Sequence, residues 1–93
     1  MTVIHVPGKK SGSIMLYALS TCGWCKKTKK LLNDLGVEYH YEDVDLLQGE
    51  EKEKVVHVIT HWNPSFSFPT LVIDNKKSII GFKEDEIKEA LGK

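Results

Sequence analysis

The 93-residue sequence has no arginine, only two cysteines and no net charge. Its 13 basic side chains are all lysines, and 13 acidic side chains balance them. Without arginine, the chain has no planar guanidinium group for bidentate contacts with phosphate or carboxylate. Without an excess of basic residues, it also lacks the charge that is typical of nucleic-acid-binding proteins. We therefore expect no nucleic-acid partner.

Long apolar segments are absent as well. No window approaches the roughly 20 apolar residues that are needed to cross a bilayer, and the N-terminal sequence MTVIHVPGKK has no pattern of a secretory signal. We expect a cytoplasmic protein with no membrane partner. Permanent disulfides are uncommon in that reducing compartment, where cysteines are more often catalytic or metal-binding.

The composition, 41% apolar and 28% charged, is typical of a soluble globular domain, and the length allows one hydrophobic core. Residues 7–12, PGKKSG, are rich in turn-forming residues. We therefore divide the chain into an N-terminal segment, residues 1–12, and a domain, residues 13–93. The N-terminal segment is either a tail or an extra edge strand.

Hydrophobic periodicity predicts the order β-α-β-α-β-β-α within the domain. The predicted elements are a strand at 13–19, a helix at 23–35, a strand at 37–44, a helix at 50–62, strands at 70–73 and 78–80, and a helix at 84–91. A βαβ crossover makes the first two strands parallel, and the hairpin around DNKK adds antiparallel strands. The fold class is therefore α/β, with a mixed four-stranded sheet and helices on both faces.

The same periodicity predicts which side chains face the core. The inner face of helix 23–35 contains Cys25, Thr28, Leu31, Leu32 and Leu35, and its lysines, at 26, 27, 29 and 30, fall broadly on the other side. The inner face of helix 50–62 contains Val55, Val58, Ile59 and Trp62. Strand 37–44 alternates, with Glu38, His40 and Glu42 on its polar face.

The two cysteines form the motif Cys22-Gly23-Trp24-Cys25 at a strand-to-helix junction, which is typical of a redox centre. Unpaired N–H groups and the helix dipole favour a negative charge at Cys22, so we expect its thiol to ionise below the usual pKa of about 8.5. Lys26 adds a nearby cation. We expect Cys22 to attack a disulfide and the shielded Cys25 to resolve the mixed disulfide. Gly23 leaves access open, and Trp24 offers an apolar rim to a partner.

Two other interpretations of the cysteine pair compete with redox chemistry. The first is a purely structural pair, which the expected compartment disfavours. The second is a zinc site, which needs four ligands, and the chain has no second cysteine pair. His57 and His61 have the i, i+4 spacing of metal ligands, but they project from the polar side of helix 50–62. We predict no metal site.

Three segments, YALSTCGWC, FPTLVID and IIGFKEDEI, resemble glutaredoxins of the thioredoxin superfamily, and the resemblance covers about residues 14–91. It implies a thioredoxin fold and thiol–disulfide oxidoreductase activity. It also implies that Pro69 is a cis-proline facing the cysteine pair, and that the backbone of Phe68 pairs with an extended stretch of the partner. Gly81, Phe82 and Asp85, in the third segment, are supporting residues in this comparison.

Several positions depart from the glutathione-using members of that family. Those members usually carry C-P-Y-C, a lysine where this chain has Leu19, a valine at Phe68, and a second glycine at Phe82. A missing lysine and a bulky ring both argue against a good site for glutathione carboxylates, unless Lys10 or Lys83 compensates. The segment IGFKEDEI instead resembles NrdH redoxins, which reduce ribonucleotide reductase and are recharged by a thioredoxin-type reductase.

The leading hypothesis is a monomeric dithiol oxidoreductase that reduces protein disulfides, such as that of ribonucleotide reductase, and receives electrons from a thioredoxin-type or other disulfide reductase. One alternative is a glutathione-dependent glutaredoxin that reduces glutathione mixed disulfides. The other is an iron–sulfur carrier, in which each of two subunits donates Cys22. We expect no tightly bound cofactor: glutathione is the alternative co-substrate, and the iron–sulfur cluster is the least favoured possibility.

Overall fold

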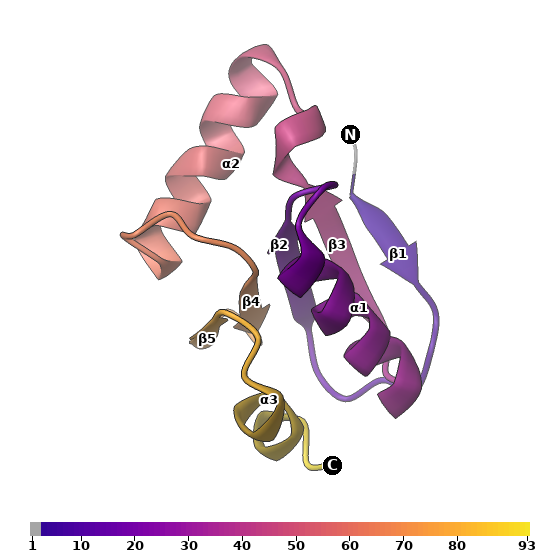
Figure 1. The fold of residues 1–93 in the computed structure, drawn as a ribbon. Coiled ribbons are helices and arrows are strands. Elements are labelled where there is room, and N and C mark those ends of the chain that lie inside the picture. Colours follow the sequence, from indigo (N-terminus) through magenta and orange to yellow (C-terminus); the bar gives the residue numbers. More distant parts are fainter. Residues whose placement is uncertain (1–2) are drawn as a thin grey trace.

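The computed structural model describes residues 3–93, which form one mixed five-stranded sheet and three α-helices (Figure 1). The elements are β1 (Ile4–Val6), β2 (Ile14–Ala18), α1 (Gly23–Leu35), β3 (Tyr39–Asp43), the 3₁₀ helix η1 (Val44–Leu46), α2 (Gly49–Trp62), β4 (Thr70–Ile73), β5 (Lys77–Ile80) and α3 (Glu84–Ala90). The strands lie in the order β1-β3-β2-β4-β5. β2 is parallel to β3, whereas the pairs β2–β4 and β4–β5 are antiparallel, as predicted.

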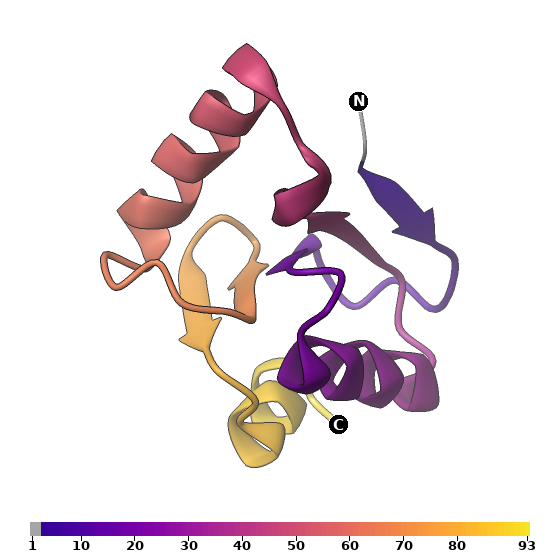
Figure 2. The same ribbon diagram turned by 45° about the horizontal axis from the view of Figure 1, so that its top comes forward.

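Helices cover both faces of the sheet: α1 and α3 lie on one face, and α2 lies on the other (Figures 1 and 2). Successive side chains of β2 point to opposite faces of the sheet, so this strand contributes to the hydrophobic clusters on both faces. Leu16 packs in the larger core with Leu32 of α1 and Ile87 of α3. Tyr17, the next residue, packs against a smaller cluster that contains Ile59 of α2. The predicted fold class is therefore confirmed.

The N-terminal segment contributes β1, which pairs antiparallel with β3 at the edge of the sheet. Of the two alternatives for the N-terminal segment, the structure therefore shows the extra edge strand. Residues 1 and 2 of this segment lie outside the described residues. Gly8 lets the chain pass close to the next strand, because a Cβ atom there would lie 2.6 Å from the carbonyl carbon of Val37. Backbone hydrogen bonds hold this crossing, from Lys9 N–H to Gly36 O and from Glu38 N–H to Lys9 O.

The inner face of α2 is narrower than predicted. Val58 is 40% exposed, whereas Ile59 is fully buried and Val55 and Trp62 are partly buried. At 100° per residue, Val58 lies about 60° from Val55, on the side away from Ile59. The prediction that Val58 faces the core is therefore wrong, because Val58 lies at the edge of the apolar stripe.

The polar face of the second predicted strand is also more buried than the alternation suggests. Glu42 is only 3% exposed. It lies on an interior strand of the sheet, and it is paired in register with Tyr17 of β2, which packs on the α2 side. Burial raises the pKa of the Tyr17 phenol, and the charge of Glu42 raises it further. Glu42 is therefore buried although it lies on the polar face of the strand, because α2 packs on that side of the sheet.

Candidate active site

The end of β2, the start of β4 and the end of β5 meet at one edge of the sheet. This follows from the register, in which Tyr17 pairs with Thr70 and Thr70 pairs with Ile80. The segments that follow or precede these strands carry most of the predicted site residues: Cys22 after β2, Phe68 and Pro69 before β4, and Gly81 and Phe82 after β5. The Gly81 N–H donates to Pro69 O at 2.9 Å and ties two of these segments together.

Cys22 is the N-cap residue of α1. Its backbone is extended, with φ −85° and ψ 118°, and its sulfur accepts a hydrogen bond from the Cys25 N–H at 3.2 Å. The sulfur therefore occupies the position of a capping oxygen, where free amide groups favour a negatively charged acceptor. Cys22 is also partly exposed, so a partner can reach it.

Cys25 is fully buried on the inner face of α1, as predicted. Burial raises the pKa of its thiol to about 12, and a hydrogen bond to Cys22 adds to the effect. Charge on Cys22 also raises this pKa, while the nearby cation Lys29 lowers it. In the reduced protein Cys25 is therefore a protonated, shielded thiol beneath a more accessible one.

Of the four lysines of α1, Lys29 rather than Lys26 is the partly buried one. Its Nζ lies 3.0 Å from Asp43 Oδ1 of β3 and 4.1 Å from the centroid of the Tyr41 ring. Lys26, the predicted supporting cation, is exposed. The prediction that places Lys29 on the outer face is wrong, because residues four apart share a helix face and Lys29 follows Cys25 at i+4. That spacing is the signal that could have identified it.

Asp45 of η1 anchors the turn that leads into Cys22. Its Oδ1 accepts a hydrogen bond from the Ser20 N–H at 2.8 Å, and its Oδ2 accepts one from the Ser20 hydroxyl at 2.5 Å. These two hydrogen bonds hold the pKa of Asp45 below its usual value, and the bond from the Ser20 hydroxyl has the larger effect. The sequence gives no signal for this contact, since the two residues are 25 positions apart.

Pro69 follows a cis peptide bond, Phe68–Pro69, as the resemblance implies. Pro69 is buried, and Phe68 is partly buried and packs against both hydrophobic clusters. The ring of Phe68 contacts that of Phe66 edge-on, with 5.2 Å between centroids. Phe68 is thus packed in place next to the start of β4, and the pairing of its backbone with a partner stays a prediction.

Asn63, which sequence reasoning did not single out, organises the loop before Pro69. The side chain is fully buried. Its Nδ2 donates to Ser67 O at 2.9 Å, to Ser67 Oγ at 3.1 Å and to Thr70 Oγ1 at 3.1 Å, and its Oδ1 accepts from the Ser65 N–H at 3.1 Å. The only sequence signal is an Asn-Pro pair that ends a helix, which predicts a loop but not its internal bonds.

Replacing Asn63 with alanine is expected to lower the free energy of unfolding by about 2 kcal/mol or more, because buried polar groups of the loop lose their partners. Asn33→Ala is a suitable control: Asn33 is exposed and accepts one hydrogen bond, from the Tyr39 hydroxyl at 3.1 Å. Its expected cost is below about 1 kcal/mol. Urea denaturation of both variants measures the difference, and equal losses would contradict this role for Asn63.

Aromatic rings border the cysteine motif on the α3 side. Trp24 is 57% exposed and stacks on Phe82, with 5.9 Å between centroids, and Lys27 Nζ lies 4.5 Å from the centre of the Trp24 ring. Gly23 is open, since a Cβ atom there would meet nothing within 4 Å. The predicted apolar rim is therefore present. Asp85 is exposed in the first turn of α3, and no contact joins it to the cysteines within residues 3–93.

Histidines and acidic residues do not assemble a metal site in the part of the chain that the structure describes. Residues 3–93 contain no group of three or more His, Cys, Asp or Glu side chains that could hold an ion. His57 and His61 are exposed on α2. None of the helices within residues 3–93 has the length and apolar character that a bilayer crossing requires.

Comparison with known proteins agrees with this geometry. The family model described as glutaredoxin matches residues 14–78. The chain belongs to the glutaredoxin family. A solved glutaredoxin from Methanosarcina mazei Go1 is 53% identical with a TM-score of 0.93, covering 100% of this chain and 90% of the other. Methanoredoxin from Methanosarcina acetivorans is 55% identical with a TM-score of 0.89, covering 92% and 90%. Glutaredoxin 1 of Rickettsia prowazekii is 36% identical over 68% of this chain and 63% of its own length.

Membership of the glutaredoxin family makes this protein a thiol–disulfide oxidoreductase with a thioredoxin fold, and it accounts for the paired cysteines at the start of α1. The predicted recognition, fold and enzyme class are thereby confirmed. The closer similarity to NrdH redoxins stays a prediction, because it depends on the IGFKEDEI segment alone.

Proposed function

We propose that this glutaredoxin-family protein reduces protein disulfides by a two-cysteine mechanism. The observation that carries the proposal is the asymmetry of the two thiols: Cys22 is accessible at the tip of α1, and Cys25 is fully buried one turn further on. A buried thiol is inaccessible to a large partner protein, but it can react with the sulfur of Cys22 one turn away.

The chemistry proceeds in two exchange steps. The Cys22 thiolate attacks one sulfur of the partner's disulfide, which forms a mixed disulfide and releases the partner's other sulfur as a thiolate. Cys25 then gives its proton to water and attacks the Cys22 sulfur, which breaks the bond between Cys22 and the partner and releases the partner's second sulfur as a thiolate. The Cys22–Cys25 disulfide forms, and the partner leaves with both sulfurs reduced after gaining two electrons.

The first step prepares the second. The hydrogen bond to Cys22 and the charge on Cys22 both raise the pKa of Cys25 in the reduced protein. Once Cys22 is a mixed disulfide it carries no charge, so the effect of that charge on the pKa of Cys25 is lost. The cation Lys29, held by Asp43, continues to favour the Cys25 thiolate.

For the electron donor, we propose a thioredoxin-type reductase rather than glutathione. Leu19 stands at the usual lysine position and packs in the smaller hydrophobic cluster, and Phe82 packs against the core and Trp24. Lys10 cannot replace the lysine that is missing at Leu19. Its neighbour Lys9 forms a β-bridge with Val37 just before β3, at the end of the sheet opposite to Cys22. Lys83 lies 3.7 Å from Glu86, which partly neutralises it.

The decisive experiment measures turnover of one protein disulfide, such as that of insulin, with two donor systems. One contains NADPH and a thioredoxin reductase, and the other contains NADPH, glutathione and glutathione reductase. We expect the first system to give a rate at least about tenfold higher, because the bound glutathione lacks the lysine contact, a charge-assisted hydrogen bond of about 1.5–3 kcal/mol. Saturable turnover with glutathione that equals or exceeds the other rate would contradict the proposed donor.

Leu19→Lys provides a matched test of the same point. Restoring the cation is expected to raise the glutathione-dependent rate and to leave the rate with thioredoxin reductase unchanged in the same assay.

The iron–sulfur alternative predicts a brown dimer after anaerobic expression, for which open space at Gly23 would leave room. A colourless monomer under those conditions would count against it.

A further inference from the structure

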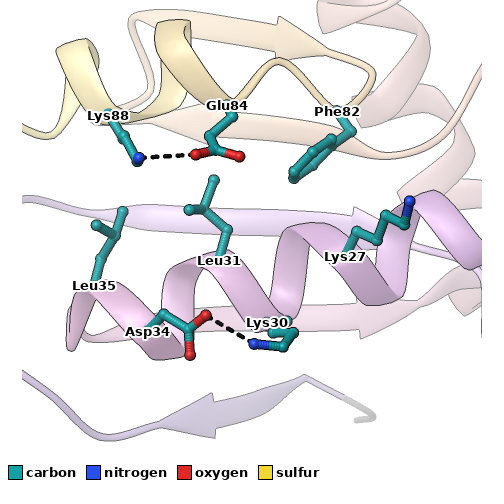
Figure 3. Close-up of a pocket in the computed structure, with 8 residues that line it drawn as sticks. All are labelled: Lys27, Lys30, Leu31, Asp34, Leu35, Phe82, Glu84 and Lys88. Carbon is teal, nitrogen blue, oxygen red and sulfur yellow. Dashed lines mark hydrogen bonds and ion pairs between the residues drawn. The ribbon is translucent and has the colours of Figure 1, made fainter.

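A groove of about 380 Å³ lies between α1 and α3 (Figure 3). Two of the residues that line it, Phe82 and Lys27, contact Trp24 of the cysteine motif. The floor of the groove is apolar. Leu31 and Leu35 of α1 point into it from one side, and the ring of Phe82 enters it from the other. This volume is at the lower end of the range for ligand pockets, which suits one apolar side chain rather than a whole cofactor.

The charges around the groove leave one cation unneutralised. Lys30 pairs with Asp34 on α1 at 3.0 Å, and Lys88 pairs with Glu84 on α3 at 2.8 Å. Among residues 3–93, no carboxylate is paired with Lys27, whose Nζ lies over the Trp24 ring. The groove therefore presents an apolar floor and a single uncompensated positive charge.

That charge lies at the end of the groove nearest to the reactive thiol. Figure 3 shows Lys27 and Phe82 at one end of the groove, and Leu35 and Lys88 at the other. Phe82 follows the β5 end that adjoins Pro69, and Lys27 is in the second turn of the helix that Cys22 caps. A polypeptide joined to Cys22 through sulfur could thus continue directly into the groove.

We propose that the groove between α1 and α3 binds a segment of the protein that this enzyme reduces, with an apolar side chain over Leu31 and Leu35 and a carboxylate facing Lys27. The inference depends on the proposed function. An acidic residue is favoured over a basic one because it gains the unpaired cation, whereas a lysine there would meet like charge. The apolar residue is favoured because it removes the leucine and phenylalanine surfaces from water.

Disulfide-cyclised peptides test this partner chemistry. Seven peptides share the same ring: one has no extension, and the other six carry Leu-Glu, Leu-Lys or Gly-Glu, placed before the ring in one series of three and after it in the other. The reduced protein is mixed with each peptide, and the second-order rate constant of a single turnover is measured, so that no electron donor is involved. In the better series, Leu-Glu is expected to react about fivefold faster than Leu-Lys, as a partly exposed ion pair allows. It is also expected to react about fivefold faster than Gly-Glu, which places no apolar side chain over the leucines.

Charge reversal at Lys27 supplies the specific readout. Lys27→Glu is expected to invert the preference, so that the Leu-Lys peptide reacts faster than Leu-Glu. Lys76→Glu changes the net charge by the same amount, but it lies in the β4–β5 turn, at the sheet end away from Cys22, and should keep the wild-type preference. Added salt should reduce the wild-type preference toward unity.

The failure of this inference differs from the failure of the proposed function. If wild-type protein reduces all seven peptides at equal rates, or if Lys76→Glu shifts the preference as much as Lys27→Glu does, the groove is not the binding surface. If it reduces no peptide at all, the two-cysteine function itself is contradicted.

Discussion

With Cys25 replaced by serine, the protein is expected to attack a protein disulfide and remain covalently attached to it. Cys22 keeps its place at the N-cap and its access to solvent, so the mixed disulfide still forms. No second thiol is left to attack it, because the chain has only two cysteines. Turnover should fall at least about 100-fold, since release then depends on slow exchange with thiols in solution. A non-reducing gel and the intact mass would show the trapped complex.

Cys22→Ser is the matched control, and it should behave differently. The remaining thiol, Cys25, is fully buried and its pKa is raised, so neither turnover nor a trapped complex is expected. If Cys25→Ser retained most of the wild-type rate on a protein disulfide, a single-cysteine mechanism would replace the one proposed. If it lost the protein activity and kept full activity on glutathione mixed disulfides, the glutathione-dependent alternative would gain support.

The local features of the fold could be predicted from the sequence because each depends on near neighbours. Helix α1 begins and ends where the motif and Gly36 indicate, since Gly36 adopts the left-handed φ of 70° that closes helices. The hairpin turn between β4 and β5 is also local: Asp74 and Asn75 both have positive φ, a conformation that Asp and Asn adopt more readily than most residues. The placement of Cys22 and Cys25 follows from the same helix.

Features that depend on distant segments could not be predicted in this way. Asp45 reaches Ser20 only because β2 and β3 run side by side. Lys29 pairs with Asp43 because α1 packs against the sheet next to β3. The bonds of Asn63 to Ser67 and Thr70 depend on how one loop folds back on itself. The groove between α1 and α3 likewise requires two helices, far apart in sequence, to pack on one face of the sheet.

The reactivity of the two thiols toward an alkylating reagent should differ greatly in the reduced wild-type protein. For a pKa of about 12, each pH unit below it lowers the thiolate fraction about tenfold, so about one Cys25 in ten thousand is ionised at pH 8. Burial further blocks the reagent. Cys22 is partly exposed, so the reagent can reach its sulfur at the N-cap of α1, where the sulfur accepts an amide hydrogen bond.

Iodoacetamide labelling between pH 6 and pH 10, followed by peptide mass mapping, measures both rates in one sample. We predict that Cys22 reacts at least about 100-fold faster than Cys25 at pH 7, and that the rate at Cys25 still rises at pH 10, because its pKa lies well above that value. Equal rates at the two cysteines, or faster labelling of Cys25, would contradict an exposed attacking thiol above a buried resolving one.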